Sequence, residues 1–186
     1  FQKVIAGNEN RAELTIEVKP AKRGNGNSLN TDAIKKKLPK EILDAIHRGI
    51  EGSFSAGISF GYPIVDVEVT VKDAQYSETF SSPFAFEAAS AMGFDTACNK
   101  AVPVLLEPVM TVDIMTPKEY VGEVISQVTM RGGLIESLES RPSIEHIRAH
   151  SPLSKMFGYS TSLRSSTQGR GTFTMEFSHF AKKEEK

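Results

Sequence analysis

Few residues of this chain have the types and spacing that catalysis requires. A nucleotide-hydrolysing site needs a glycine-rich turn followed by Lys-Ser or Lys-Thr, so that backbone amides hold the phosphates and the hydroxyl binds magnesium. No Gly-Lys pair occurs in the 186 residues. His146 and His150 are four residues apart, which on a strand puts both on one face but too far apart to share a zinc ion. We therefore predict no catalytic residue, no metal site and no cofactor in this chain, and expect it to act by binding.

Residues 151–171 carry the most specific pattern in the chain. Ser151 is predicted to cap a helix with Pro152 in its first turn, because proline lacks an N–H that this position does not need. Gly158 is interpreted as a glycine on that helix where another element packs closely, and Gly169 is predicted to help end the helix. The helix is expected to bury one apolar stripe, which includes Leu153, Met156, Phe157, Ser160 and Leu163.

The same pattern occurs 35 residues earlier, from Thr116. Thr116 and Glu119 have the spacing of a capping box, in which each side chain bonds the other's backbone N–H. Strands are predicted before the two helices, over 109–115 and 144–149, and a strand is also predicted after each helix, over 172–177 in the second case. Two β-α-β units folded together form a four-stranded antiparallel sheet with both helices on one face. We predict a ferredoxin-like βαββαβ domain over residues 105–186.

These segments give the second half a resemblance to the C-terminal domain of elongation factor G, a translational GTPase that moves tRNA and mRNA through the ribosome. The first half resembles the preceding domain of that family more weakly. The resemblance implies that this chain is a two-domain fragment, and that the parent protein binds GTP and magnesium in a part outside it. The matching segments are Leu106–Met110, Gly122–Val124, Arg131-Gly132, Pro152–Tyr159, Leu163–Ser165 and Thr167–Gly171, with Gly61–Asp66, Ser81-Ser82, Ala85-Phe86 and Pro103 in the first half.

The first half, residues 1–104, is predicted to be α+β as well. Apolar and polar side chains alternate over 13–19 and 64–72, which predicts two strands with one buried face each. Residues 22–31, rich in glycine and asparagine, are predicted to form a loop. One helix is predicted from the four-residue spacing of Leu38, Ile42, Ile46 and Ile50, and a second from the cap Ser82 with Pro83 in its first turn. The resemblance implies a β-rich α/β lever domain whose β-α-β crossover is left-handed, against the usual hand.

The resemblance also implies that two loops at the tip of this lever contact tRNA in the decoding centre. Both loops depart from the family here. Residues 6–13 replace a glycine-rich loop that ends in Gln-Tyr-Gly-His, and within 74–82 a serine stands where the family has histidine. Serine cannot carry a positive charge, and three tip carboxylates, those of Glu9, Glu13 and Glu78, would repel RNA phosphate. The predicted contact residues are Gly7, Asn8, Asn10, Arg11, Tyr76 and Ser77.

Other residues have two interpretations that the sequence leaves open. Between Lys19 and Arg48 there are eight basic residues against three acidic ones, an excess that fits RNA phosphate or an ordinary solvated helix start. The resemblance implies rRNA contact for Arg164 and Arg170, whereas local hydrogen bonding at the helix end is the alternative. An exposed Tyr159 could stack on a base, but it could equally lie in the core. Gly158, Gly169 and Pro152 are interpreted as the structural part of the signature.

Three functions fit these observations. The first is GTP-dependent translocation by the parent protein, with the ribosome, its rRNA, tRNA and mRNA as partners. The second is a divergent paralogue that acts in ribosome recycling with the ribosome recycling factor, or in ribosomal protection. The third is a stand-alone RNA-binding module, although no strand has the Lys/Arg-Gly-Phe-Gly/Ala-Phe pattern of RNA-recognition motifs. We expect a cytoplasmic protein, since no apolar run approaches the roughly 20 residues that a membrane span needs. We also expect a monomer.

Overall fold

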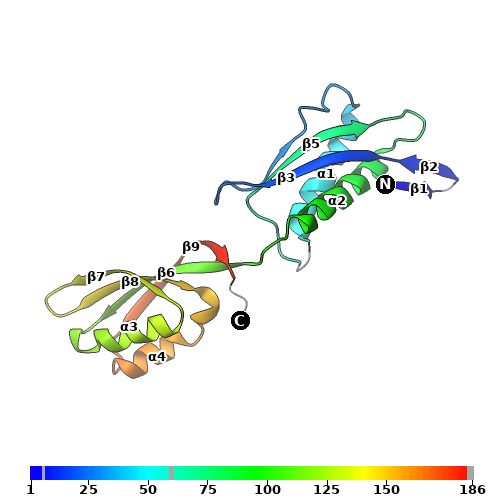
Figure 1. Cartoon of the computed structure of the whole chain (residues 1–186). Helices are drawn as coiled ribbons and strands as arrows, with labels where there is room; N and C mark the ends of the chain where they lie inside the picture. The colour runs from blue at the N-terminus through cyan, green and yellow to red at the C-terminus, as the bar shows by residue number, and fades with distance from the viewer. Residues whose placement is uncertain (6, 59–60, 184–186) are drawn as a thin grey trace. The chain divides into compact units, whose positions relative to one another are not determined.

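The computed structural model describes residues 1–5, 7–58 and 61–183, which divide into two compact units, Phe1–Pro103 and Val104–Lys186 (Figure 1). Each unit combines strands and helices around a hydrophobic core of its own. The α+β class predicted for the chain is therefore confirmed, and the units are considered one at a time.

The first unit contains a small hairpin and a three-stranded sheet. In the sheet, β5 lies between an antiparallel β3 and a parallel β4. The chain from β4 through α1 to β5 is the β-α-β unit in which the resemblance implies a left-handed crossover. The elements are β1 (Gln2–Ile5), β2 (Asn8–Arg11), β3 (Glu13–Pro20), β4 (Ser28–Asn30), α1 (Lys40–Ala56), β5 (Val67–Gln75) and α2 (Pro83–Lys100).

Both predicted strands of this unit exist, but their surroundings differ from the prediction. The strand predicted over 64–72 begins at Val67, because Asp66 has a positive φ of 58° and its carboxylate accepts hydrogen bonds from the N–H groups of Gly24 (3.0 Å) and Gly26 (2.8 Å). The prediction of a loop over 22–31 is wrong at Ser28–Asn30, which forms β4. A three-residue strand leaves too little alternation to be recognised in a sequence.

The two helices of the first unit pack against each other and against the sheet (Figure 1). Ile42, Ile46 and Ile50 of α1 are buried as their four-residue spacing predicts. The predicted cap of α2 is confirmed, since the Ser82 hydroxyl accepts a hydrogen bond from the Ala85 N–H at 3.2 Å and Pro83 begins the helix. This cap fixes the first turn of α2.

The second unit is the predicted ferredoxin-like domain. Its four strands are antiparallel in the order β7-β8-β6-β9, and both helices cover one face of the sheet (Figure 1). Buried side chains of β6, β8, α3 and α4 form the core between the sheet and the helices. The elements are β6 (Leu106–Thr116), the 3-10 turn η1 (Lys118–Tyr120), α3 (Val121–Met130), β7 (Leu134–Ser140), β8 (Glu145–Pro152), the 3-10 turn η2 (Leu153–Lys155), α4 (Tyr159–Ser166) and β9 (Thr172–Lys182).

The start of the second signature helix was predicted wrongly. Ser151 and Pro152 end β8 instead of beginning a helix, and α4 starts only at Tyr159. Gly158 precedes it with a φ of 75°, and a Cβ added there would meet nothing within 4 Å. The close-packing interpretation of Gly158 is therefore wrong, and the glycine instead permits a left-handed backbone conformation. This break in the helix turns Phe157 outward, 76% exposed, so its predicted burial is also wrong.

The capping box predicted for the first signature helix is not formed. Thr116 is the last residue of β6, and its buried hydroxyl has no hydrogen-bond partner among the described residues. Glu119 lies in the η1 turn and binds Arg170 instead of reaching back to Thr116. The helix therefore begins after a 3-10 turn, and α3 has no side-chain cap.

Candidate nucleic-acid interface

Two segments of the first unit, residues 2–11 without residue 6 and residues 76–82, meet at one end of its sheet, and we call them the tip. The first is the β1–β2 hairpin, in which Gln2 lies opposite Arg11 and Ile5 opposite Asn8. Gly7 turns the chain between the strands with a φ of 82°, a conformation that glycine adopts without a steric penalty. The second segment follows β5, whose last residue, Gln75, pairs with Glu13 at the start of β3.

The two tip segments are hydrogen-bonded to each other. The Arg11 N–H donates to the Phe80 carbonyl at 2.8 Å, and the Ser82 hydroxyl donates to the Asn10 side-chain oxygen at 2.6 Å. Because Ser82 also caps α2, the hairpin is tied directly to the start of that helix. Within the second segment, the N–H of Ser77 donates to the Ser81 hydroxyl at 3.0 Å. The structure thus brings together the two loops that the sequence proposed as one contact surface.

The predicted contact residues have different surroundings within the tip. Asn10 is bound to Ser82, whereas Arg11 forms an exposed ion pair with Glu13 at 3.5 Å. Such exposed pairs contribute at most about 1 kcal/mol and separate readily. Tyr76 and Ser77 are exposed, while the side chain of Asn8 lies outside the described part of the chain.

The tip offers apolar and hydrogen-bonding groups and little positive charge. Its charged residues, counted with the adjoining Glu13, are the cations Lys3 and Arg11 and the carboxylates Glu9, Glu13 and Glu78. Large apolar side chains are exposed beside them at Val4, Tyr76 and Phe80. Phosphate neutralisation dominates nonspecific binding to nucleic acid. The cations of the tip are matched by its carboxylates, and Glu13 adds one more beside it, so the tip cannot supply that part of RNA binding by itself.

The two arginines predicted to contact rRNA in the second unit differ in how they are held. Arg170 binds Glu119 and the Tyr120 hydroxyl, and its guanidinium lies 4.8 Å from the centre of the Tyr120 ring. It therefore joins the turn after α4 to the start of α3. Arg164 is exposed and donates to the Ser160 hydroxyl at 2.5 Å, one helical turn earlier. Arg164 has fewer side-chain contacts than Arg170, so its guanidinium is more available to bind a partner.

Arg131 has a structural role that the sequence reasoning missed. Its guanidinium donates to the carbonyls of Lys155 (2.7 Å) and Phe157 (3.1 Å) and to the Ser162 hydroxyl (3.0 Å). It also lies 5.4 Å from the centre of the fully buried Tyr159 ring. The end of α3 is thereby fastened to the turn before α4. The Arg-Gly pair at 131–132 was visible in the sequence, but its partners lie more than twenty residues away and no local pattern names them.

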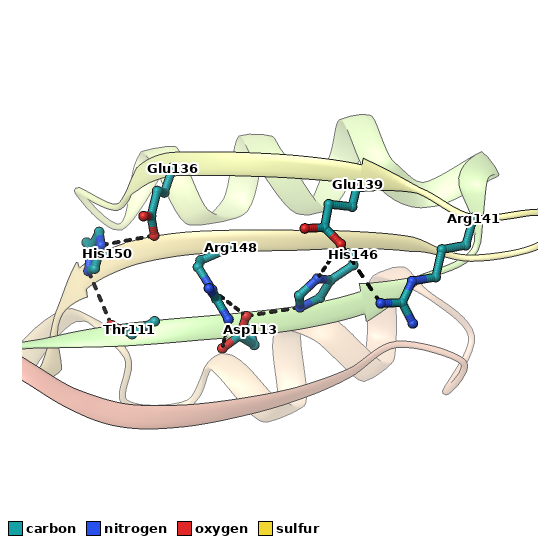
Figure 2. A network of polar contacts seen from close by, with 8 residues as sticks. All are labelled: Thr111, Asp113, Glu136, Glu139, Arg141, His146, Arg148 and His150. Atoms are coloured by element: carbon teal, nitrogen blue, oxygen red, sulfur yellow. Dashed lines mark hydrogen bonds and ion pairs between the residues drawn. The ribbon is translucent and has the colours of Figure 1, made fainter.

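The sheet face opposite the helices of the second unit carries a network of charged side chains (Figure 2). Asp113 lies between Arg148 (2.9 Å) and His146 (3.0 Å), and the hydrogen bond from Arg148 is the main reason that the pKa of Asp113 is lowered. His150 binds Glu136 at 3.2 Å on the neighbouring strand. His146 and His150 thus lie on one face, His146 beside Asp113 and Glu139 and His150 beside Glu136. Among the described residues, no three His, Cys, Asp or Glu side chains form a group that could hold a metal ion.

One motif with catalytic spacing was missed in the sequence. Residues 57–61 read Gly-Ile-Ser-Phe-Gly, the spacing of a nucleophile elbow. That motif requires a strand before the serine and a helix after it. Here Gly57 follows the C-terminus of α1 and the next element is β5, so the context is reversed. Ser59 lies outside the described residues, and we assign it no role.

In the parts of the chain that the structure describes, no helix is both long enough and apolar enough to cross a bilayer.

Comparisons with known proteins match both units. Residues 1–102 match the family model "Elongation factor G, domain IV", and residues 104–186 match "Elongation factor G C-terminus". Elongation factor G 1 of Treponema denticola is 51% identical over 193 residues, which cover 97% of this chain and 28% of that protein. Elongation factor G of Aquifex pyrophilus is 43% identical over 180 residues, which cover 97% of this chain and 26% of that protein.

A crystal structure of a protein from Thermus thermophilus matches with a TM-score of 0.86 and 28% sequence identity, covering 98% of this chain and 27% of that one. The chain thus spans about a quarter of the length of the proteins that it matches. The order of the two matched regions is the order of the two units along the chain. The chain therefore belongs to the elongation factor G family, and it contains the family's domain IV followed by its C-terminal domain.

Proposed function

We propose that this chain is the part of a ribosomal translocase that carries the RNA-contacting lever, and that its parent moves tRNA and mRNA through the ribosome in a GTP-dependent step. The observation that carries the proposal is the tip. Two segments some seventy residues apart in sequence are bonded to each other at the start of α2, in a chain that matches the elongation factor G family over residues 1–102 and 104–186.

A lever needs a stiff path from its tip to its base. The tip is bonded to the start of α2, a helix of 18 residues and therefore about 27 Å long at 1.5 Å per residue. Along its length α2 packs on α1, and Phe54 of α1 meets Phe94 of α2 edge to face at 5.3 Å between ring centres. A displacement at the tip is therefore transmitted to a packed helix pair and not to a loose loop. The scarcity of positive charge at the tip suits a steric wedge better than a phosphate clamp.

The remaining parts of the proposal concern the parent protein. The two matched regions are domain IV and the C-terminus of the family, so we assign GTP and magnesium binding to the part of the parent outside this chain. The partners of the parent protein are the ribosome with its rRNA, tRNA and mRNA. We expect the parent to act as a monomer in the cytoplasm.

A second function is favoured by the composition of the tip. Glu9 and Glu78, counted with the adjoining Glu13, outnumber Lys3 and Arg11, and Ser77 stands where the family has histidine. These changes suit a paralogue that splits ribosomes together with the recycling factor, or one that acts in ribosomal protection. A stand-alone RNA-binding module is less well supported, because the open sheet face of the second unit carries paired carboxylates and histidines (Figure 2) where such modules stack bases on aromatic rings.

The test compares tRNA–mRNA translocation with subunit splitting by the full-length parent on the same ribosomes, the recycling factor being added for splitting. The proposal expects translocation, slowed several-fold by Tyr76→Ala combined with Phe80→Ala. Met92→Ala is the control, since Met92 is an exposed apolar residue of α2 outside the tip. Splitting without translocation would establish the recycling function instead. Translocation at the wild-type rate by the tip variant would contradict a role of the tip.

A further inference from the structure

Four lysines lie beside the tip in the segment that leads into α1: Lys35, Lys36, Lys37 and Lys40, which we call the lysine cluster. Ile34 is fully buried and Leu38 is 8% exposed, so the segment is anchored on the core on both sides of the three consecutive lysines. All four lysines are exposed. Because the anchors face inward, the side chains between them must face solvent.

The backbone that presents these lysines is ordered by hydrogen bonds. The N–H groups of Ile34 and Lys35 both donate to the Thr31 carbonyl, at 3.1 and 3.0 Å, and the Lys37 N–H donates to the Ile34 carbonyl at 2.9 Å. The Thr31 hydroxyl lies 3.2 Å from a ring nitrogen of His47 on α1. The cations are therefore held on a folded turn packed against α1, and less backbone entropy is lost when they bind a partner.

The lysine cluster and the tip lie at the same end of the first unit's sheet. Lys37 binds Asp73 of β5 at 3.3 Å, and this hydrogen bond is the main reason that the pKa of Asp73 is lowered. Asp73 is two residues from Gln75, where β5 ends and the second tip segment begins. A partner that reaches the tip at this end of the sheet therefore comes near the lysines as well.

The charges of the lysine cluster are largely uncompensated. Among the described residues, no carboxylate forms an ion pair with Lys35, Lys36 or Lys40, whereas Lys37 is bound to Asp73. Residues 32–41 carry the four lysines against two carboxylates, those of Asp32 and Glu41. The tip counted with the adjoining Glu13, by contrast, has one more carboxylate than cations. Helix stability does not explain these lysines, because cations at the start of a helix oppose its dipole.

We infer that the lysine cluster is a binding site for the phosphate backbone of RNA, and that it supplies the electrostatic contact that the tip lacks. This inference rests on the proposed function, in which the first unit meets RNA in the ribosome. The tip then contributes shape and apolar contact, while Lys35 and Lys36 neutralise phosphates beside it. Each neutralised phosphate releases counterions and gives the affinity a measurable dependence on salt.

The test measures how the affinity of the full-length parent for ribosomes depends on salt. Lys35→Gln combined with Lys36→Gln removes two cations and leaves the Lys37–Asp73 pair intact. The matched control is Lys22→Gln with Arg23→Gln, two exposed cations that follow β3 at the opposite end of the sheet. Two phosphate contacts correspond to a change of about 1.4 to 1.8 in the slope of log affinity against log salt, or about a tenfold change in the affinity ratio between about 50 and about 200 mM salt.

The inference expects that change for the lysine variant and a much smaller one for the control. Equal slopes for wild type and the lysine variant, with translocation intact, would overturn the inference and leave the proposed function standing. An equal loss in both double variants would also overturn it, because the effect would then be one of net charge. The proposed function itself would be contradicted if the parent did not translocate and if its activity on ribosomes did not depend on the tip.

A second measurement distinguishes RNA from an acidic protein surface. An iron chelate attached through Lys36→Cys, in a parent without other reactive cysteines, generates hydroxyl radicals beside the lysine cluster. Cleavage of RNA near the bound factor is the expected result. Cleavage confined to a ribosomal protein would overturn the assignment to RNA. Thermal unfolding of each variant, measured first, shows that the changes act on binding and not on folding.

Discussion

Gly49 allows α1 and α2 to approach each other, and its replacement by alanine tests how tightly these two helices are packed. A Cβ at this position would lie 2.4 Å from the Glu87 carbonyl oxygen and 2.3 Å from the Ser90 hydroxyl. Real Cβ atoms essentially never come closer than 3.0 Å, so the helices must separate by at least about 0.6 Å, the difference between 3.0 and 2.4 Å. The carbonyl belongs to the backbone of α2 and cannot turn away. The Ser90 hydroxyl is held at 2.7 Å from the Phe86 carbonyl.

The expected effect is a difference between two opposing contributions. Overpacking of a filled core costs about 1 to 3 kcal/mol, whereas alanine in place of glycine favours a helix by about 1 kcal/mol. We expect a net loss of up to about 2 kcal/mol in the free energy of unfolding of the first unit. For a domain of this size, each 1 kcal/mol of loss lowers Tm by roughly 4 to 8 °C.

Gly52→Ala is the matched control, because Gly52 lies one turn later on α1 and a Cβ there would meet nothing within 4 Å. It should raise the stability of the unit by up to about 1 kcal/mol. Calorimetry of the chain measures both variants, and only the transition of the first unit should shift. If Gly49→Ala were as stable as Gly52→Ala, the helices could not be as close as the structure shows, and the argument for a stiff lever would lose its main support.

The other predictions concern single side chains. Gly158→Ala should cost about 1 kcal/mol, since only the positive φ opposes a side chain there, and the larger Gly158→Asn should cost less, because asparagine tolerates this conformation; a larger loss for asparagine than for alanine in thermal unfolding would restore the close-packing interpretation. Because Arg148 lowers the pKa of Asp113 below its ordinary value of 3.8, the pair should stabilise the second unit above that pH and lose its effect as the pH falls through the lowered pKa. Arg148→Ala should therefore weaken the unit at pH 7 more than at pH 2, and equal losses in acid and neutral unfolding would contradict this. Burial raises the pKa of Cys98 to about 11, so its thiol should react slowly with a disulfide reagent at pH 8 until the first unit opens; rapid reaction in the folded protein would contradict its burial.

The sequence predicted the elements that rest on regular periodicity or on a local cap. Alternation over nine residues is enough to find β5, and Ser82 with Pro83 marks the start of α2 because both act within one turn. The ferredoxin-like order follows from two repeated β-α-β units and is confirmed.

The errors occur where one residue changes the backbone direction. Gly158 in a left-handed conformation divides what reads as one amphipathic helix, and the apolar stripe was continued across it, so that Phe157 was placed in the core. The tip loops could be located only through the family resemblance. The contact between the two loops depends on hydrogen bonds between residues some seventy positions apart. Neither hydrophobic periodicity nor a helix cap predicts such a contact from the sequence. For the same reason, the position of the lysine cluster beside the tip was not visible in its sequence.

The bond between Arg11 and Phe80 is made by main-chain atoms alone. A main-chain bond does not depend on which side chain either residue carries, provided that the donor does not become proline and the turns are kept. Substitutions can therefore exchange the charges and hydroxyls of the tip one by one while its outline persists. A duplicated gene that diverges by this route retains a lever of the same shape and acquires a different partner for it.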